Sequence, residues 1–112
     1  MKLLVVSMNA SFAGAVSQLA KTKLDIEEVV VSDHEHALER FLETEPTHVL
    51  VCEYEAGVSG GKFVVGKQTW ADITASSLPG QRLVRTGLME CTEPDFIRAP
   101  FLAEDLRKIL LE

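Results

Sequence analysis

Three short runs made entirely of apolar residues constrain the fold of this chain more than any other feature. Leu3–Val6, Val29–Val31 and Val49–Val51 are each too short for a helix and are rich in β-branched side chains. A strand with one exposed face alternates apolar and polar residues, so an uninterrupted apolar run is typical of a strand buried on both faces. Such strands occur in parallel sheets that helices cover on both sides. The runs therefore predict an α/β fold.

Amphipathic stretches separate these runs and predict the crossover helices. Apolar residues recur at helical spacing over residues 11–21, which predicts a first helix. Ser32 and Glu35 match a capping box and predict the start of a second helix, which Pro46 ends. Residues 102–111 place leucine and isoleucine on one face and charged residues on the other, as in an amphipathic helix. These segments complete a βα pattern.

Two more strands are predicted in the second half of the chain, over residues 82–86 and 95–98. Only eight residues separate these two strands, and they include glycine and proline. A parallel pair needs a crossover of about a dozen residues when a helix makes the connection. We therefore expect at most one helical turn here, so that a fourth helix is shortened or missing.

The segment over residues 57–70 allows three interpretations. Gly66 and Lys67 suit the turn of a two-residue β-hairpin, because glycine fits the first position of a type II′ turn. Thr69 and Asp72 suit the N-terminal cap of a short helix. The four glycines of the segment also suit an extended loop. The sequence leaves these three alternatives open.

Composition excludes several classes of partner. The 112 residues, 46% of them hydrophobic, fit one globular domain over residues 1–112, and the net charge of −6 disfavours nucleic acid and anionic membrane surfaces. No apolar stretch approaches the length of a membrane helix or a secretory signal, so we expect a cytoplasmic protein. Cys52 and Cys91 lie far apart in sequence without clustered histidines, so we expect neither a metal nor a cofactor.

The order of strands and helices, together with two short motifs, resembles the receiver domain of two-component response regulators. Thr86 followed by Gly87 matches the end of the fourth receiver strand, and Pro100 followed by Phe101 matches the segment after the fifth. The resemblance implies a flavodoxin-like three-layer sandwich of five mostly parallel strands. It also implies a cis peptide bond between Ala99 and Pro100.

The residues that perform the chemistry of receivers are replaced in this chain. Ser7 and Met8 stand where the resemblance implies an acidic pair that holds Mg²⁺, and Ala99 stands where it implies a lysine. Cys52, or Glu53 with a shift of one residue, occupies the place of the phosphorylated aspartate. Phosphoryl transfer needs the metal and a cation at the developing charge. The resemblance therefore implies a pseudoreceiver that is not phosphorylated and is not an enzyme.

Two functions follow from this interpretation. The first is a non-catalytic module of signal transduction that binds a protein partner or forms a homodimer, through the surface beside residues 87–111 that a shortened helix would leave uncovered. The residues predicted for this interaction surface are Trp70, Phe96, Arg98 and Phe101. The alternative is a small-ligand or redox sensor that uses the vestigial pocket around Cys52, with Glu53 and Thr86 beside it.

Overall fold

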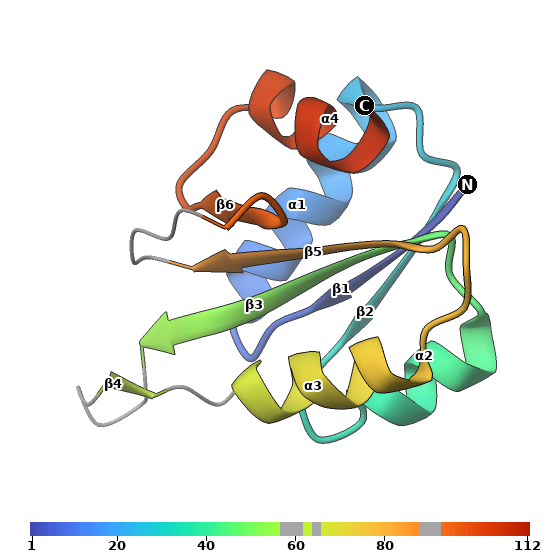
Figure 1. The fold of residues 1–112 in the computed structure, drawn as a ribbon. Helices are drawn as coiled ribbons and strands as arrows, with labels where there is room; N and C mark the ends of the chain where they lie inside the picture. The colour runs from blue at the N-terminus through green and yellow to red at the C-terminus, as the bar shows by residue number, and fades with distance from the viewer. Residues whose placement is uncertain (57–61, 64–65, 88–92) are drawn as a thin grey trace.

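The structure is a computed structural model that describes residues 1–56, 62–63, 66–87 and 93–112. The elements in chain order are β1 (Lys2–Val6), α1 (Ala10–Lys23), β2 (Glu28–Ser32), α2 (Ala37–Thr44), β3 (His48–Ala56), β4 (Lys62–Phe63), α3 (Gly66–Ser76), β5 (Arg82–Gly87), β6 (Phe96–Arg98) and α4 (Ala103–Leu111) (Figure 1). Each predicted strand is present, and β3 continues past the predicted end at Cys52.

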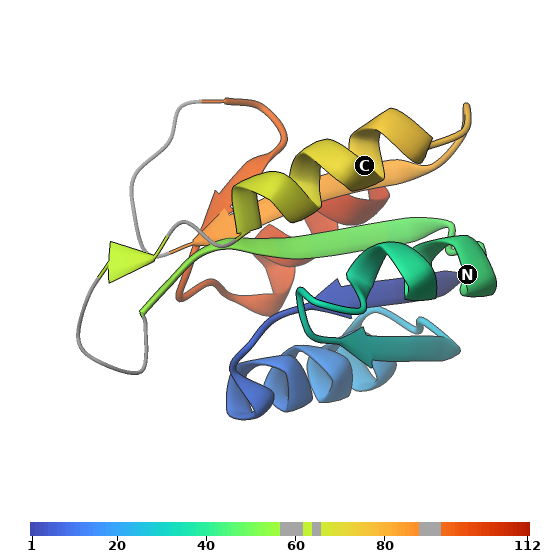
Figure 2. The ribbon, with the colours of Figure 1, turned by 90° about the horizontal axis from the view of Figure 1, so that it is seen from below.

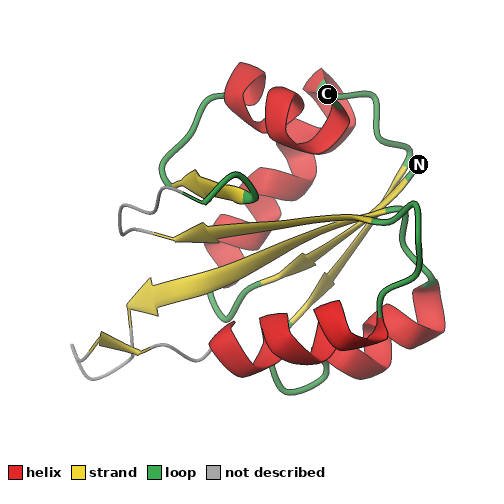
Figure 3. Cartoon of the chain, viewed as in Figure 1, coloured by secondary structure: helices red, strands yellow, loops and turns green. Residues whose placement is uncertain are grey.

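The five main strands form one parallel sheet in the order β2-β1-β3-β5-β6. The two-residue strand β4 lies off this path and pairs antiparallel with the end of β3 (Figure 3). The chain starts at β1 inside the sheet and adds β2 on one side of it. The later strands β3, β5 and β6 are then added on the other side of β1. In such sheets the point of reversal, at the carboxyl ends of the central strands, is where ligands bind. The fold is flavodoxin-like, as the sequence predicts.

Helices cover both faces of the sheet and enclose two apolar clusters. α1 and α4 pack on one face, where Leu3, Val5, Leu50 and Val84 point. Figure 2 shows α2 and α3 side by side on the other face. That second face is filled by a separate set of buried side chains, namely Leu4, Val6, Ala37, Phe41, Val49, Val51 and Ile73. The alternation of neighbouring residues between the two clusters explains why the central strands are apolar throughout.

The start of α2 differs from the prediction. The capping box of Ser32 and Glu35 is wrong, because Ser32 ends β2 and its hydroxyl donates to the carbonyl of Asp33. The helix begins at Ala37, and the carboxylate of Asp33 accepts a hydrogen bond from the backbone N–H of His36 at 2.8 Å. Aspartate here makes the local turn that serine was expected to make, because its side chain reaches a backbone donor three residues on.

The segment around Gly66 is helical. The hairpin with its turn at Gly66 and Lys67 is wrong, since both residues lie in the first turn of α3. The predicted helix is confirmed, but Thr69 lies inside it instead of capping it, and its hydroxyl is bonded to the ring of His34. Residues 57–61 and 64–65 of this segment lie outside the described residues.

The connection from β5 to β6 contains no helix in its described part, residues 93–95, and residues 88–92 lie outside that part. Within the described residues, this connection therefore adds no helix to the face of the sheet on which α2 and α3 pack. None of the described helices is long and apolar enough to span a membrane.

Candidate functional site at the carboxyl end of the sheet

The residues predicted for a vestigial receiver pocket all lie at the carboxyl end of the sheet. Because β1, β3, β5 and β6 are parallel, their last residues meet at one edge. The residues are Ser7 and Met8 after β1, Cys52 and Glu53 in β3, Thr86 in β5, and Ala99 and Pro100 after β6. The structure thus brings the predicted pocket positions to one end of the molecule, from four different strands.

Ser7 and Met8 organise the start of α1. The backbone N–H of Ser7 donates to the carbonyl of Ser32 on β2, and its hydroxyl lies within hydrogen-bond distance of the backbone of Asn9. Asn9 in turn caps α1 by accepting from the N–H of Phe12. Met8 is 43% exposed. These two positions carry no carboxylate, so their side chains offer no anionic ligand for a divalent cation.

Cys52 and Thr86 are paired neighbours on β3 and β5. Both are buried, and Thr86 is completely so. The hydroxyl of Thr86 has no hydrogen-bond partner among the described residues. The two residues are therefore neighbours in the sheet, and burial keeps both side chains from the protein surface.

The segment after β6 follows the prediction closely. The peptide bond between Ala99 and Pro100 is cis, as the resemblance to receivers implies. The backbone N–H of Ala99 donates to the carbonyl of Gly87 at 2.8 Å, which ties this segment to the end of β5. Ala99 is buried and supplies a methyl group where receivers have a lysine, so this position provides no positive charge.

Glu53 and Arg85 form a buried ion pair in the same region. An Nη1 hydrogen of Arg85 is donated to Oε2 of Glu53 over 3.1 Å, and the two side chains are 10% and 3% exposed. The pairing of β3 with β5 shifts register between Cys52 and Tyr54, which makes Glu53 the additional residue of a β-bulge. A bulge re-aims the side chain that it carries. Here it accompanies a glutamate that points at an arginine of the neighbouring strand.

Three more side chains surround the guanidinium of Arg85. Asp95, just before β6, accepts from Nη2 at 2.8 Å, and Glu93 accepts from the same nitrogen. The guanidinium carbon of Arg85 lies over the indole of Trp70 on α3, 5.1 Å from the ring centroid, within the range of a cation–π interaction. The arginine cluster, as we call Glu53, Trp70, Arg85, Glu93 and Asp95, thus joins β3, α3, β5 and the loop before β6.

The arginine cluster keeps its cation fully charged. Burial acts against the charge of Arg85, but its bonds to Asp95 and Glu53 outweigh that effect and raise the pKa of Arg85 above its usual value. The Nε hydrogen of Arg85 has no partner among the described residues. One arginine against three carboxylates leaves the cluster with an excess of negative charge, which two partly exposed acids, Glu93 and Asp95, carry toward the solvent.

Gly66 lets α3 begin directly against the bulge. A Cβ atom at Gly66 would lie 2.4 Å from Cα of Glu53 and 2.7 Å from the carbonyl oxygen of Cys52. Both are backbone atoms that cannot move without disturbing β3. Only glycine therefore allows this approach. The close contact brings Trp70, one turn further along α3, over Arg85.

Sequence reasoning named Glu53 and Trp70 but missed their connection through Arg85. A signal was present in the sequence. Glu53 and Arg85 each directly follow an apolar run, Val49–Cys52 and Leu83–Val84, and buried charges are rare unless they are paired. The pairing itself could not be predicted because the two residues lie 32 positions apart and the bulge decides which way Glu53 points.

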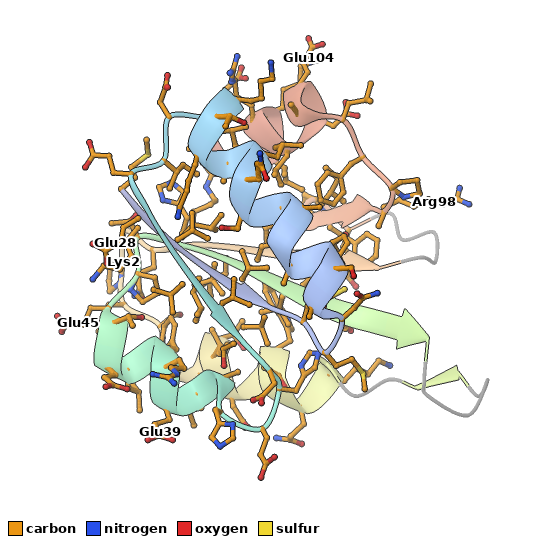
Figure 4. The ribbon with its side chains drawn as sticks, turned by 180° about the vertical axis from the view of Figure 1, so that it is seen from behind. Lys2, Glu28, Glu39, Glu45, Arg98 and Glu104 are labelled. Atoms are coloured by element: carbon orange, nitrogen blue, oxygen red, sulfur yellow. The ribbon has the colours of Figure 1, made fainter. Side chains whose placement is uncertain are left out.

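The four residues predicted for an interaction surface do not form one patch. Phe96 and Arg98 lie beside Arg85 and Gly87 in register, so they point to the face that carries Trp70. Phe96 is buried there, whereas Arg98 is exposed and extends away from the sheet (Figure 4). Phe101 lies on the opposite face and packs edge-on against Phe12 of α1, with ring centroids 6.1 Å apart.

The two histidines between β2 and α2, His34 and His36, have partners within the chain. Nδ1 of His34 lies 3.1 Å from Oγ1 of Thr69, which joins the loop before α2 to α3. His36 pairs with Asp33 at 2.9 Å. Across the described residues, no group of three potential metal ligands converges.

Comparison with known proteins gives matches of structure only. No protein-family model matches the chain, and no curated protein matches it by sequence. Among solved structures, the signal receiver domain of a modulated diguanylate cyclase from Desulfovibrio desulfuricans G20 superposes with a TM-score of 0.72 at 14% identity, over 96% of this chain and 88% of that domain. The anti-anti-sigma factor PhyR from Bartonella quintana superposes with a TM-score of 0.70 at 14% identity, over 96% of this chain and 44% of its own.

Oxidised flavodoxin 2 from Bacillus cereus is a more distant match, with a TM-score of 0.52 at 17% identity, over 96% of this chain and 91% of the flavodoxin. Identities this low relate the folds and carry no function with them. The order of strands and these superpositions together lead to one conclusion. The chain has a receiver-like fold of the flavodoxin-like class.

Proposed function

We propose that this chain is a non-catalytic, receiver-like signalling module that is not phosphorylated and acts by binding a protein partner. The observation that carries this proposal is the ion pair of Glu53 and Arg85. The resemblance to receivers implies a phosphorylated carboxylate on the third strand, and Glu53 is the carboxylate that this chain has beside that place. Here that carboxylate is buried and already bound to a cation of the same chain.

The remaining positions agree with the absence of phosphoryl transfer. Nucleophilic attack by Glu53 would require its oxygen to leave Arg85 and to meet a phosphodonor in line. It would also require a divalent cation and a second positive charge beside the transferred group. Ser7 and Met8 supply no carboxylate for a cation, and Ala99 supplies no charge.

The face of β5 and β6 next to α3 is the surface that we propose for the partner. Leu83 and Trp70 are half-buried there and Arg98 is exposed, and among the described helices only α3, through Trp70, reaches over β5 on that side. Tryptophan and arginine are enriched among the residues that contribute most to protein interfaces. Because Glu93 and Asp95 stand at the rim, we expect the partner to present basic residues around an apolar centre.

Treatment with a small-molecule phosphodonor in the presence of Mg²⁺ tests the proposal. We expect the intact mass of the chain to stay unchanged, while an active receiver domain in the same reaction gains a phosphoryl group. The fluorescence of Trp70, the single tryptophan, should also stay constant on titration with Mg²⁺. A gain of one phosphoryl group on Glu53 would contradict the proposal.

The alternative function, a sensor that uses Cys52 and Thr86, has one observation in its favour, the hydroxyl of Thr86 without a partner among the described residues. The burial of both side chains speaks against ready access by a ligand or an oxidant. Reaction of the native chain with a thiol reagent distinguishes the two functions. A sensor predicts rapid modification of Cys52, whereas the interaction module predicts slow modification that speeds up on unfolding.

A further inference from the structure

The outer edge of β2 is a second surface with binding capacity. β2 is the edge strand of the sheet, and among the described strands it pairs with β1 alone. Figure 4 shows β2 in front, with α1 on one side and α2 on the other, and no described element beyond its outer edge. Its residues, Glu28–Ser32, are a glutamate, three valines and a serine.

The direction of the backbone groups on β2 follows from one hydrogen bond. The carbonyl of Ser32 accepts from the N–H of Ser7, so the backbone groups of Ser32 point toward β1. Backbone groups of neighbouring strand residues point to opposite edges, so those of Val30 also point toward β1. Val29 and Val31 therefore direct two N–H and two C=O groups outward, where they can pair with another strand.

This edge lacks the protection that exposed edges usually have. Natural edge strands are guarded by lysines, prolines, bulges or a covering segment. β2 has no proline, bulge or lysine, and its one charged residue, Glu28, is paired with Lys2 at 3.2 Å. Val31 is 46% exposed, so the edge offers an apolar side chain as well as outward backbone groups. An edge of this kind is suited to pairing with a further strand.

We propose that the β2 edge binds β2 of a second copy of this chain, antiparallel, about a two-fold axis that passes through Val30. In this register Val29 lies opposite Val31 of the second copy, and the reverse. Both residues direct their backbone groups outward, so the two copies exchange four hydrogen bonds. The two sheets then join into one continuous sheet, and the same patch serves both copies.

In this register, the β2 side chains of one copy fit those of the other in shape and charge. Val29 and Val31 both lie on the side of the sheet that α1 covers. Val29 of one copy contacts Val31 of the other across the strands, as β-branched pairs do in stable sheets. Val30 meets its own copy on the face of α2. Glu28 lies opposite Ser32 and not opposite another Glu28, so no like charges face each other. A shift of the register by two residues would lose two of the four hydrogen bonds.

The surface next to Val31 leaves room for the second copy. An open groove of about 460 Å³ runs between β2 and α1, lined by Gly14, Ser17, Gln18, Lys21, Thr22 and Val31. The lining contains no carboxylate and a single lysine. The two-fold axis places the two α1 helices antiparallel across this groove. Because Lys21 lies in the last turn of α1, the two copies of Lys21 are then at opposite ends of the helix pair. Small side chains at Gly14 and Ser17 allow the helices to approach.

Analytical ultracentrifugation of the purified chain, together with an edge variant, tests the dimer. We expect a monomer–dimer equilibrium in the micromolar range, because one strand and one helix flank make a small interface. Val31→Lys places a charge opposite Val29 at two equivalent positions, and we expect it to raise the dissociation constant at least tenfold. Leu78→Lys is the matched control, because Leu78 is 66% exposed between α3 and β5, and β1 and β3 separate β5 from β2 in the sheet, so it should leave the constant unchanged.

A cysteine at Val30 tests the register. Residues on the axis of this dimer face each other in a non-hydrogen-bonded pair, with Cα atoms close enough for a disulfide. We expect Val30→Cys to form a covalent dimer under mild oxidation and Glu28→Cys to form little. The wild-type chain treated in the same way reports any reaction of its own cysteines.

Several outcomes would overturn the proposal. One is a wild-type chain that stays monomeric at concentrations of hundreds of micromolar. Another is a dimer that Val31→Lys leaves intact while circular dichroism shows the native fold. A third is a covalent dimer that forms as readily through Glu28→Cys as through Val30→Cys. Each result is independent of phosphorylation and of the partner surface on β5 and β6.

Discussion

The guanidinium of Arg85 on β5 holds the carboxylate of Glu53 on β3 at 3.1 Å, with both side chains almost entirely out of contact with solvent. Removing one member of such a pair leaves the other charge buried and uncompensated, which typically costs about 3–5 kcal/mol of unfolding free energy. Replacing both members by apolar groups can be nearly neutral. The two members differ in their other contacts, and this difference leads to a first prediction.

Arg85→Met should destabilise the fold by about 3 kcal/mol, because Glu53 then has no cation within the cluster. Glu53→Gln should cost less, about 1 kcal/mol, because Asp95 and Glu93 still neutralise Arg85. Urea denaturation measures both values, and the double variant Glu53→Leu with Arg85→Met should recover part of the loss. Equal costs for the two single variants would contradict the geometry of the cluster.

Gly66→Ala should destabilise the chain by about 2 kcal/mol or more, since its Cβ would meet backbone atoms of Cys52 and Glu53. Gly14→Ala is the matched control in α1, where a Cβ meets nothing within 4 Å. That substitution should stabilise the chain by about 0.5–1 kcal/mol, because alanine favours the helix over glycine. Thermal unfolding of the two variants shows whether each substitution lowers or raises the stability of the chain. A stabilising effect of Gly66→Ala would contradict the close contact of α3 with β3.

Asn9→Ala should cost about 1 kcal/mol, because the side chain of Asn9 accepts from the N–H of Phe12 at the start of α1. Ser11→Ala, in the exposed first turn of the same helix, should change stability by less than about 0.5 kcal/mol. Chemical denaturation of the two variants at one pH compares them directly. Similar effects of the two substitutions would show that the cap contributes nothing.

Two histidines should titrate on opposite sides of the usual histidine pKa of 6.5. Burial, Arg82 and the N-terminus lower the pKa of His48, whereas the hydrogen bond to Asp33 raises the pKa of His36. NMR titration of the imidazole signals measures both directly. His48→Gln and His36→Gln assign the signals, and the prediction is wrong if His48 becomes protonated at a higher pH than His36.

The same two shifts have opposite effects on stability. His48 takes up a proton less readily in the native chain than in the unfolded one, so its contribution is lost as pH falls below about 6.5. His36 takes up a proton more readily in the native chain, so its contribution is present below about 6.5 and is lost as pH rises through its native pKa. His48→Gln should therefore make the chain less sensitive to acid between pH 7 and 5, as pH-dependent urea denaturation would show.

The order of the strands and helices could be predicted from the sequence, because its signals are local. The uninterrupted run Leu3–Val6 indicates a strand buried on both faces, and the amphipathic pattern of residues 102–111 indicates a helix. Both were confirmed with bounds that differ by a residue or two. The cis bond before Pro100 was predicted from the resemblance to receivers and was confirmed as well.

Local signals failed where a tertiary contact was stronger. Gly66 and Lys67 suited the turn of a hairpin, but Gly66 instead starts α3, because glycine alone fits against the backbone of Glu53. Ser32 suited a helix cap, but its carbonyl is bonded to Ser7 as part of the sheet. In both cases the residue has a local structural preference, but a contact with a segment distant in sequence determines the structure that it adopts.

The sequence by itself determined the class of the fold, because the apolar runs and amphipathic stretches that specify its strands and helices are local signals. The loss of receiver chemistry stays a prediction from the residues at positions 7, 8 and 99. Only the tertiary structure decided that Glu53 points at Arg85, that Trp70 covers this pair, and that Phe101 lies on the opposite face from Trp70. The physical reason is that a bulge and the pairing of β3 with β5 set the direction of these side chains across 32 residues of sequence, and no local pattern records that direction.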